Sequence, residues 1–475
     1  MNILLLNLPY GKDFCRSARW AAKSRGRVQR HPDWMLIAAS VLEKTGNNVR
    51  FVDGATLNLN EENIKKIISE FVPDLIVCHT TTPSIYNDIH FAKISKEISN
   101  AKTVLVGPHV SAVVENTFEI ADGAVDIIAR GEYDYILKDI AQGKLLTEIE
   151  GISYVKNGAV INNPQRNPLD VNELPFPAWH HIKPEWYKDA GKRFPFLTLI
   201  SGRGCFGNCT FCRDTPVMYG KKLRYRDPKL VVDEIEYDFK LFPHIKEIMF
   251  ETDTFTASRA HVQGVCEEIL KRNLKISWSC NVRVDIDLDL LPLMKKAGCR
   301  MLMIGFEFGT QEALDAVKKG IKLEQSVKFA ETAHKLGFTL HGCFMIGAPD
   351  ETRESAQKTI DFAKSLPLDT VQFSGICVYP GTELYEWAKK NNYIVPKNWT
   401  EWLNDSLEQV TLLNYPQLSK KEIDEFIDKG LRQFYLRPKQ IIKMLFSIRN
   451  IYDLKRKIFG LSSFINYFFN KKERD

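Results

Sequence analysis

Three cysteines near the middle of the chain have the spacing of a metal-binding loop. Cys205, Cys209 and Cys212 follow an apolar run at 196–200. This run ends in the polar, glycine-rich stretch 201–204, which predicts a buried strand that passes into a loop. Three thiolates in one loop can hold three irons of a 4Fe–4S cluster, and the fourth iron then has no protein ligand. A structural zinc loop is the alternative, but zinc sites use four ligands and no matching Cys or His pair follows nearby.

The cysteine spacing also carries a family resemblance. CxxxCxxC after the first strand of a barrel half resembles the radical S-adenosylmethionine (SAM) superfamily, and Phe211 lies between its second and third cysteines with a flat ring for a purine. The resemblance implies that the amino and carboxylate groups of SAM chelate the open iron. It also implies that an electron from the cluster cleaves SAM to a 5′-deoxyadenosyl radical. An external one-electron reductant, such as flavodoxin or ferredoxin, and sensitivity to oxygen follow from that chemistry.

The elements around this loop are predicted to form a partial (β/α)6 barrel. Residues 196–392 alternate apolar strands with helical stretches six times. A parallel barrel carries its ligand residues at the carboxyl ends of its strands, so polar motifs at those ends are candidates for the site. Five such motifs follow the predicted strands in order, at 250–255, 280–285, 305–311, 342–349 and 379–382.

Five residues in these motifs are candidates for SAM binding. Glu251 and Asp253 stand where the superfamily carries its acidic contact to the SAM amino group. Asn281 and Arg283 can reach ribose hydroxyls and a carboxylate. Glu307 belongs to the next motif, which has a phenylalanine where family members usually have a serine.

The first part of the chain, residues 1–145, alternates short apolar strands with amphipathic stretches. This alternation predicts a doubly wound parallel sheet whose ligands bind beyond the carboxyl ends of its strands. The segments at those ends resemble the cobalamin-binding domain that precedes the barrel in one radical SAM subfamily. The residues implied as cobalamin contacts are Thr82, Ser84, Gly107, His109 and Glu132.

One departure from that subfamily concerns the cobalt ligand. The DxHxxG motif, whose histidine replaces the lower axial ligand, is absent. Either cobalamin binds without a protein imidazole, or the domain keeps the fold and has lost the cofactor. For His109 alone, a satisfied histidine at a strand end is the simpler interpretation.

Two segments connect or precede these units. The loop between Pro9 and Trp34 is long and basic, with arginines at 16, 19, 25, 27 and 30. It is either a solvated loop or an anion clamp over the ligand crevice. Residues 146–195 are predicted to be a linker that contains a small strand pair.

Charge is unevenly distributed along the 475 residues. The net charge is +6, but the stretch from Lys429 onward has twelve Lys or Arg and three acids. Residues 393–475 are predicted to be a basic helical region, which either caps the open side of the barrel or contacts an acidic membrane. The apolar start at Met1 lacks the basic lead of a signal peptide, and no uncharged apolar run reaches the length of a membrane span. We therefore expect a cytoplasmic protein, peripheral at most to the inner face of the membrane, and no nucleic-acid partner.

These features predict a radical SAM enzyme that takes a hydrogen atom from an unactivated carbon of a small-molecule or lipid substrate. In the methylating members that the resemblance implies, methylcobalamin then delivers a methyl group. The alternative is radical ring formation, ring contraction or rearrangement on a sugar-bearing lipid or natural product, without methyl transfer. A non-catalytic electron carrier would need a fully ligated cluster and no substrate barrel, so the open cluster argues against it.

Overall fold

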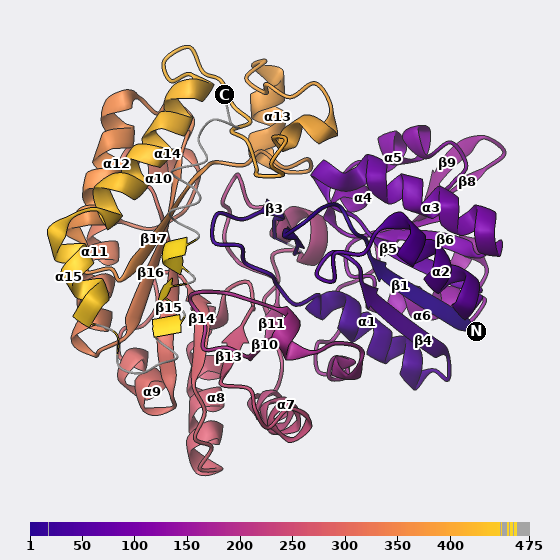
Figure 1. Cartoon of the computed structure of the whole chain (residues 1–475), viewed down its shortest axis with the longest axis horizontal. Coiled ribbons are helices and arrows are strands. Elements are labelled where there is room, and N and C mark those ends of the chain that lie inside the picture. Colours follow the sequence, from indigo (N-terminus) through magenta and orange to yellow (C-terminus); the bar gives the residue numbers. More distant parts are fainter. Residues whose placement is uncertain (18, 447, 449–453, 456, 459, 463–475) are drawn as a thin grey trace.

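Two parallel sheets, each covered by helices, make up most of the protein (Figure 1). The structure, a computed structural model, describes residues 1–17, 19–446, 448, 454–455, 457–458 and 460–462. The far end of the basic C-terminal region, including most of the aromatic residues expected there, lies outside the described residues.

The first sheet has the order β4-β1-β5-β6-β7-β8-β9, in which β4 to β7 pair in parallel and β8 and β9 run antiparallel. Its strands are β1 (Asn2–Asn7), β4 (Asn48–Asp53), β5 (Leu75–His79), β6 (Lys102–Val106), β7 (Ile127–Ala129), β8 (Ile152–Lys156) and β9 (Ala159–Asn162). Its helices are α1 (Asp33–Lys44), α2 (Glu61–Phe71), α3 (Ile85–Ser99), α4 (Pro108–Ala112), α5 (Val114–Ala121) and α6 (Asp134–Ala141). The β8–β9 hairpin extends this sheet past residue 145.

Apolar side chains on both faces explain why this sheet is central. Ile3 and Leu5 of β1 belong to one buried cluster, whereas Leu4 and Leu6 belong to another. Because side chains alternate along a strand, the two clusters lie on opposite faces of the sheet. The near-continuous apolar run of β1 is therefore typical of a strand with helices on both sides.

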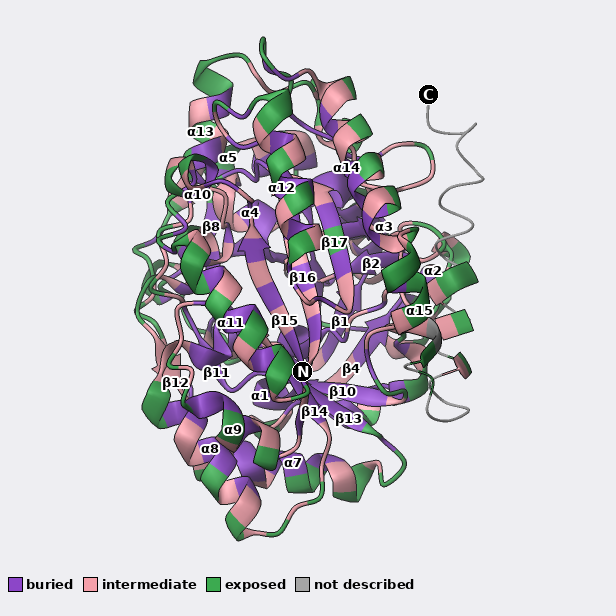
Figure 2. Ribbon diagram, turned by 90° about the vertical axis from the view of Figure 1, so that its left-hand side faces the viewer, coloured by how far each residue is buried: buried purple, intermediate pink, exposed green. Residues whose placement is uncertain are grey.

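The second sheet is parallel throughout, in the order β10-β13-β14-β15-β16-β17, as expected for a partial barrel. Its strands are β10 (Phe196–Leu199), β13 (Glu247–Phe250), β14 (Trp278–Val282), β15 (Cys299–Glu307), β16 (Thr339–Ile346) and β17 (Thr370–Gly375). The helices that connect or follow them are α7 (Pro228–Leu241), α8 (Arg259–Lys271), α9 (Leu290–Lys296), α10 (Gln311–Ala316), α11 (Leu323–Lys335), α12 (Arg353–Ser365) and α13 (Glu383–Lys390). Figure 2 shows the strands buried behind helices with exposed outer faces.

Two short hairpins lie beside these sheets. β2 (Phe14–Arg16) pairs with β3 (Ala21–Lys23), and β11 (Gly202–Arg203) pairs with β12 (Arg224–Tyr225). The β2–β3 hairpin lies between the two sheets in Figure 1. The long basic loop therefore has its own structure and sits where the two halves of the protein meet.

The C-terminal helices cover the free edge of the barrel sheet. α14 (Lys420–Tyr435) buries Ile423, Ile427 and Phe434, and its Gly430 lies directly against the Phe373 ring of β17. α15 (Pro438–Phe446) follows, with the Gln440 amide donating to the backbone oxygen of Asp369 at 2.6 Å. The prediction that helices cap the open side is thus confirmed for α14.

Candidate functional site

The cysteine loop leaves the first barrel strand through a tightly packed glycine. Gly204 has φ +92°, and a Cβ built there would lie 2.3 Å from the backbone oxygen of Lys222. Farther along, the Thr210 amide donates to the Val317 oxygen at 3.0 Å, which ties the loop to the segment after α10. Gly207 lies between two sulfurs, since its Cβ position is 3.4 Å from Cys205 Sγ and 3.8 Å from Cys209 Sγ. The backbone thus holds all three thiols in one short loop.

The number of thiols suits a cluster with an open iron better than a structural zinc ion. A structural zinc ion takes four protein ligands, whereas this loop supplies three cysteines. Three thiolates can hold three irons of a 4Fe–4S cluster and leave the fourth iron without a protein ligand.

Burial favours the protonated form of two of these thiols, Cys209 and Cys212, in the protein without a cluster. Burial raises the pKa of Cys212 to about 12, with Asp214 adding to the shift. Burial also raises the pKa of Cys209, although Lys319 and Arg283 work to lower it. Thiolates are the ligands of iron, so cluster binding at this loop releases protons.

Carboxylates lie on one side of the cysteine loop. Asp253 accepts a hydrogen bond from the Gly204 amide at 3.1 Å and one from Arg19 Nη2 at 3.3 Å. Burial raises the pKa of Asp253 to about 7, against the lowering effect of Arg19. Glu251 Oε1 lies 3.7 Å from Arg19 Nε, and its buried Oε2 has no hydrogen-bond partner. Two of the predicted SAM residues therefore form one acidic group that Arg19 contacts.

Cations lie on the other side of the loop. Arg283 donates to both oxygens of Asp285 at 2.8 Å, and its guanidinium lies over the Phe206 ring. Lys319 Nζ donates to Glu307 Oε1 at 2.6 Å. Glu307 has φ +65°, a conformation that is uncommon outside glycine and that often marks functional sites. The predicted residues Arg283 and Glu307 thus come together around a lysine that the sequence did not single out.

Asn281 and Phe211 complete the predicted barrel residues. The Nδ2 atom of Asn281, at the end of β14, is buried and has no hydrogen-bond partner, so it has a donor available for a ligand. Phe211 is half-buried and packs against the main apolar core. Neither side chain makes a polar contact that would exclude it from ligand binding.

Four of the predicted cobalamin residues lie together at the carboxyl edge of the first sheet. Gly107, directly after β6, has φ +111°, and a Cβ there would lie 2.7 Å from the Thr80 oxygen. Ser84 donates to Asp88 at 2.8 Å, whereas the buried Thr82 Oγ1 has no partner. Both ring nitrogens of His109 are buried and unpartnered, and burial lowers the pKa of its imidazole to about 3. The interpretation of His109 as a satisfied histidine is therefore wrong.

Glu132, the fifth predicted cobalamin residue, makes an ion pair instead. Its Oε2 accepts from Arg224 Nη1 at 2.9 Å, and the same oxygen accepts from the Leu169 amide at 3.2 Å. A neighbouring buried pair joins Arg203 of β11 to Asp134 of α6 at 2.6 Å. Glu132 thus belongs to a group of ion pairs that fastens the first sheet's helices to the barrel.

A cavity of about 30 Å³ lies where the two halves meet. Both nitrogens of His31, Trp34 Nε1 and the Tyr133 hydroxyl are buried there without partners. Unpaired buried polar groups are costly, so they mark a place where a ligand or water is expected. The residues that line the cavity are Asn7, Arg16, Ser17, Arg19, Arg30, His31, Pro32, Asp33, Trp34, Met35, His79, Tyr133 and Glu251.

Three arginines of the basic loop are paired inside the protein. Arg16 makes a fully buried ion pair with Asp88, Arg30 pairs with Asp189 at 2.6 Å, and Arg19 contacts the barrel carboxylates. For these three residues the prediction of an anion clamp is wrong, because their charges are already matched by carboxylates. They hold the β2–β3 hairpin between the sheets.

Comparison with known proteins identifies the family. The sequence profile of the Radical SAM superfamily matches residues 199–363. An uncharacterized methyltransferase of Pyrococcus horikoshii is 35% identical over 436 residues, covering 90% of this chain and 92% of that protein. The chain belongs to the radical SAM superfamily.

A further relative and a solved structure are also similar to this chain over most of its length. The anaerobic magnesium-protoporphyrin IX monomethyl ester cyclase of Rubrivivax gelatinosus is 30% identical over 372 residues, covering 75% of this chain and 66% of that protein. The radical SAM methyltransferase TsrM of Kitasatospora setae, solved with cobalamin and a 4Fe–4S cluster, superposes with TM-score 0.71 at 15% identity. That superposition covers 98% of this chain and 99% of TsrM, so the two proteins share the arrangement of both sheets.

The sequence did not single out two residues that contact the predicted SAM-binding residues. Lys319 lies in a run of lysines with no motif, and its contact with Glu307 depends on how the segment after α10 folds back. Arg19 was noted as part of a basic loop, but its contact with residues 232 and 234 positions away could not be read from the sequence. In the described part of the chain, no helix combines the length and apolar character of a membrane span.

Proposed function

We propose that this radical SAM enzyme is a cobalamin-dependent methyltransferase that acts on an unactivated carbon of a small molecule. One observation carries the proposal. His79, at the end of β5, and Glu251, directly after β13, line the same cavity. The carboxyl ends of the two sheets therefore meet at one small cavity, so a cofactor at each sheet would face the other.

The cysteine loop fits the cluster that the superfamily uses. Cys205, Cys209 and Cys212 would bind three irons, whereas a structural zinc ion would need a fourth protein ligand. The cluster supplies the electron that cleaves SAM. Asp253 and Glu251 would accept hydrogen bonds from the SAM amino group, and Arg283 and Lys319 would donate to its carboxylate.

The first sheet fits a large cofactor with hydrogen-bonding groups. Thr82 and His109 have unpaired polar atoms, and Gly107 leaves space that a side chain would fill. These residues, with Ser84, would hold cobalamin, which supplies the methyl group when bound. The low pKa of His109 keeps its imidazole neutral and able to accept a hydrogen bond as well as donate one.

A second function has support from the relatives. The cyclase of Rubrivivax gelatinosus shares 30% identity with three quarters of this chain, so ring formation without methyl transfer is the alternative. Both reactions use the same radical and the same cavity. Only the fate of the substrate carbon distinguishes them.

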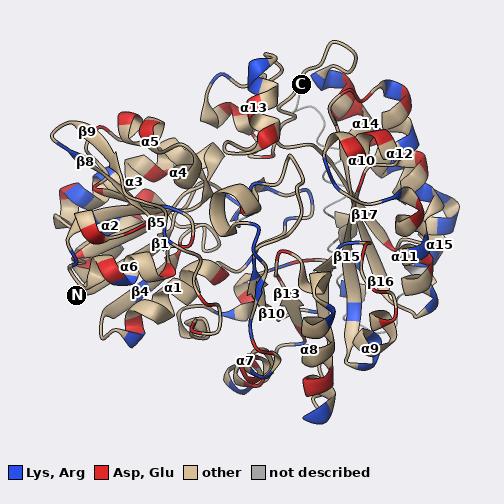
Figure 3. Ribbon diagram, turned by 180° about the vertical axis from the view of Figure 1, so that it is seen from behind, with Lys and Arg blue, Asp and Glu red and all other residues tan. Residues whose placement is uncertain are grey.

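The remaining partners follow from this chemistry and from the C-terminal region. An external reductant such as flavodoxin or ferredoxin would supply the electron. We place the enzyme in the cytoplasm, with α15 as a contact to the membrane surface. On this helix Ile441, Ile442 and Phe446 are 44%, 53% and 84% exposed. Figure 3 shows basic residues on the same helix.

The decisive experiment is anaerobic purification with cobalamin supplied, followed by reaction with SAM deuterated in its methyl group and a metabolite extract. Methyl transfer predicts about four irons and one corrin per chain and a deuterated product. Ring formation predicts 5′-deoxyadenosine and an unlabelled product. Failure to form 5′-deoxyadenosine under dithionite would overturn both functions.

A further inference from the structure

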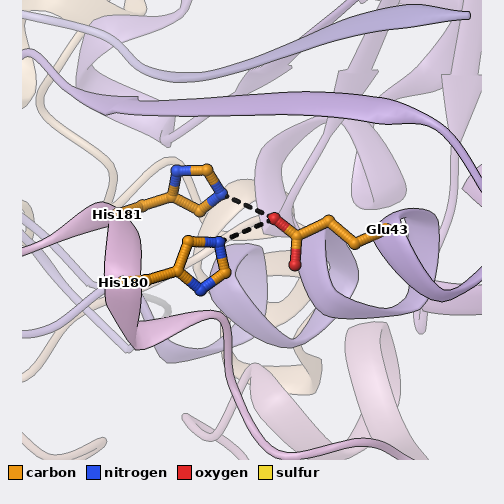
Figure 4. A group of neighbouring side chains, drawn as sticks. All are labelled: Glu43, His180 and His181. Carbon is orange, nitrogen blue, oxygen red and sulfur yellow. Dashed lines mark hydrogen bonds and ion pairs between the residues drawn. The ribbon is translucent and has the colours of Figure 1, made fainter. Parts of the chain in front are cut away.

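Two histidines and a glutamate converge on one point of the surface outside the radical SAM site. Glu43 lies at the end of α1, and His180 and His181 lie in the 3₁₀ turn η3 (Trp179–His181). The Nε2 atom of each imidazole is 2.9 Å from the same oxygen, Glu43 Oε1. Figure 4 shows both rings pointing toward that carboxylate.

Other histidines on this chain meet carboxylates one at a time. His90 Nε2 lies 2.9 Å from Glu61, and His244 contacts Glu185 in the same way. Over the described ranges, the group at Glu43 is the one whose three ligand atoms all lie within 4.8 Å of one another. Hydrogen bonds can hold such a group together, but its composition and geometry also match a metal site.

The distances fit the bond lengths of a transition metal. With metal–nitrogen and metal–oxygen bonds of about 2.0–2.2 Å, a ligand separation of 2.9 Å corresponds to an angle of roughly 90° at the metal. A tetrahedral angle requires the ligand atoms to separate by about half an ångström more. The side chain of His180 is 53% exposed and that of Glu43 is 28% exposed, so both can make this shift while the half-buried His181 stays in place.

The protonation state also suits a metal. A glutamate carboxyl ordinarily ionises well below neutral pH, so Glu43 can supply a charged oxygen. Imidazole ligands bind metals in their neutral form, which histidine reaches near neutral pH.

We propose that Glu43, His180 and His181 bind a divalent transition-metal ion with the ligand preferences of Zn²⁺. Imidazole nitrogens favour Zn²⁺, Ni²⁺ and Co²⁺, whereas Ca²⁺ and Mg²⁺ prefer a shell of oxygen ligands. Three protein ligands leave at least one position for water, and the exposed His180 provides the path by which the ion enters.

The position of the group gives the metal a structural role. The N-terminal residue of α1, Asp33, accepts a hydrogen bond from Thr198 of β10, and Leu36 accepts one from the Ala178 amide. α1 thus contacts the barrel at one end and the connecting segment before the barrel along its length. A metal at Glu43 would fix that segment to the last turn of α1 and so hold the first sheet against the barrel. This role does not depend on which reaction the enzyme catalyses.

The test uses the full chain with its cluster reconstituted, washed with EDTA and then exposed to Zn²⁺. After desalting, elemental mass spectrometry measures the number of zinc and iron atoms per chain. The wild type is expected to retain about one zinc per chain, and the His180→Ala/His181→Ala variant close to none, with equal iron in both. Glu43→Gln loses the negative charge but keeps an oxygen that accepts hydrogen bonds from both imidazoles. The zinc affinity of this variant should therefore fall about tenfold or more, although the hydrogen bonds remain. Zinc should raise the apparent melting temperature of the wild type and not that of Glu43→Gln.

Two controls separate this site from other zinc ligands. His90→Ala removes an imidazole from an ordinary pair and should leave the zinc count unchanged. The Cys205→Ala/Cys209→Ala/Cys212→Ala variant should still bind zinc, because its remaining ligands lie elsewhere. A wild type that retains no zinc, or a Glu43→Gln variant that binds zinc as tightly as the wild type, would overturn the proposal.

Discussion

The residues around the cysteine loop include acids and cations that are paired with one another. Asp253 and Glu251 contact Arg19, whereas Arg283 pairs with Asp285 and Lys319 pairs with Glu307. The amino-acid end of SAM has an amino group and a carboxylate, so Asp253 or Glu251 can accept from the first and Arg283 or Lys319 can donate to the second. Charge-assisted hydrogen bonds are the strong ones, and a partly buried site screens them less than water does.

The three cysteines should be necessary for the cluster. Replacing Cys205, Cys209 and Cys212 together with Ala is expected to abolish iron binding and SAM cleavage, since these thiols are the proposed iron ligands. Iron analysis and 5′-deoxyadenosine formation after anaerobic reconstitution test this. Cys266→Ala, a change in the buried α8, should retain the cluster. SAM cleavage by the triple variant would refute the assignment.

SAM binding should depend on pH through Asp253. The pKa of this carboxyl is about 7, so it is largely protonated at pH 6 and ionised above pH 7. The ionised carboxylate is the better acceptor for the SAM amino group, and affinity should therefore rise roughly tenfold from pH 6 to pH 7.5. Anaerobic calorimetry with the reconstituted protein measures this profile.

Asp253→Asn provides the matched test of that profile. The variant should bind SAM about tenfold more weakly at pH 7.5, because a contact worth roughly 1.5–3 kcal/mol loses its charge. It should also lose the rising limb between pH 6 and pH 7.5. The same rising limb in the variant would assign the titration to another group, of which Glu251 is the nearest.

The sequence predicted the residues that belong to local motifs and missed those brought in from elsewhere. Cysteine spacing and strand-end acids are local patterns, so Cys205 and Asp253 could be found without a structure. Lys319 and Arg19 act through contacts that depend on tertiary packing. Glu132 shows the opposite case, since it follows a strand as expected but its carboxylate is used by Arg224.

At the scale of elements, the β2–β3 hairpin links the two sheets through two arginines. One arginine contacts the first half of the protein and the other contacts the barrel. Arg16 pairs with Asp88 of the first half, and Arg19 pairs with Asp253 of the barrel. A SAM ammonium at Asp253 would therefore meet a carboxylate that Arg19 already contacts. The hairpin and SAM compete for the same charge.

Removing Arg19 should move the pH dependence of SAM binding. Arg19 lowers the pKa of Asp253, so Arg19→Ala is expected to raise that pKa and to shift the rise in SAM affinity to higher pH. Calorimetry between about pH 6 and about pH 8.5 tests this, with Arg19→Lys as the control that keeps the charge and should shift the rise less. A rise at the wild-type pH in Arg19→Ala would show that Arg19 does not set the charge of Asp253.

Alternation of strands and helices was sufficient to predict the parallel strands of both sheets, because these strands are rich in apolar residues. The β8–β9 hairpin was assigned to the linker, whereas it extends the first sheet. The β2–β3 hairpin was not predicted, since its strands are three residues each and lack an apolar pattern. The helical region after residue 393 was predicted without a partner for each helix, and the structure shows that α14 packs on β17. Pattern identifies a buried face, but only packing shows what covers it.

The contact between α14 and the barrel should be sensitive to size at Gly430. A Cβ there would lie 3.0–3.1 Å from atoms of the Phe373 ring, so a large side chain has no space. Gly430→Leu should destabilise the protein by about 1–3 kcal/mol through overpacking, which is measured as a lower apparent melting temperature. Lys429→Leu, at a neighbouring position, should have a much smaller effect. An unchanged melting temperature in Gly430→Leu would show that α14 is not firmly packed on β17.

At the scale of the whole molecule, the two sheets are held together by buried ion pairs and by the segments between them. Arg203 with Asp134 and Arg224 with Glu132 join the barrel to the first sheet's helices. Buried ion pairs of this kind contribute more to a defined arrangement than to net stability, because each charge loses its hydration. This arrangement directs the carboxyl ends of both sheets toward the shared cavity.

The charge of the whole molecule is concentrated at its C-terminal end, where α15 also exposes apolar side chains. Lys439 of α15 is exposed and Phe446 is 84% exposed, so basic and apolar groups reach solvent on the same helix. Each basic residue near an anionic bilayer contributes about 1 kcal/mol, and this attraction falls off within a Debye length. We expect the full chain to sediment with anionic vesicles at low salt and to be released at high salt. Ile441→Gln/Ile442→Gln/Phe446→Gln should weaken this binding without loss of the fold, because all three side chains are exposed. If the folded wild type does not sediment with anionic vesicles, the membrane contact is excluded. A substrate that diffuses freely to the enzyme would then be favoured.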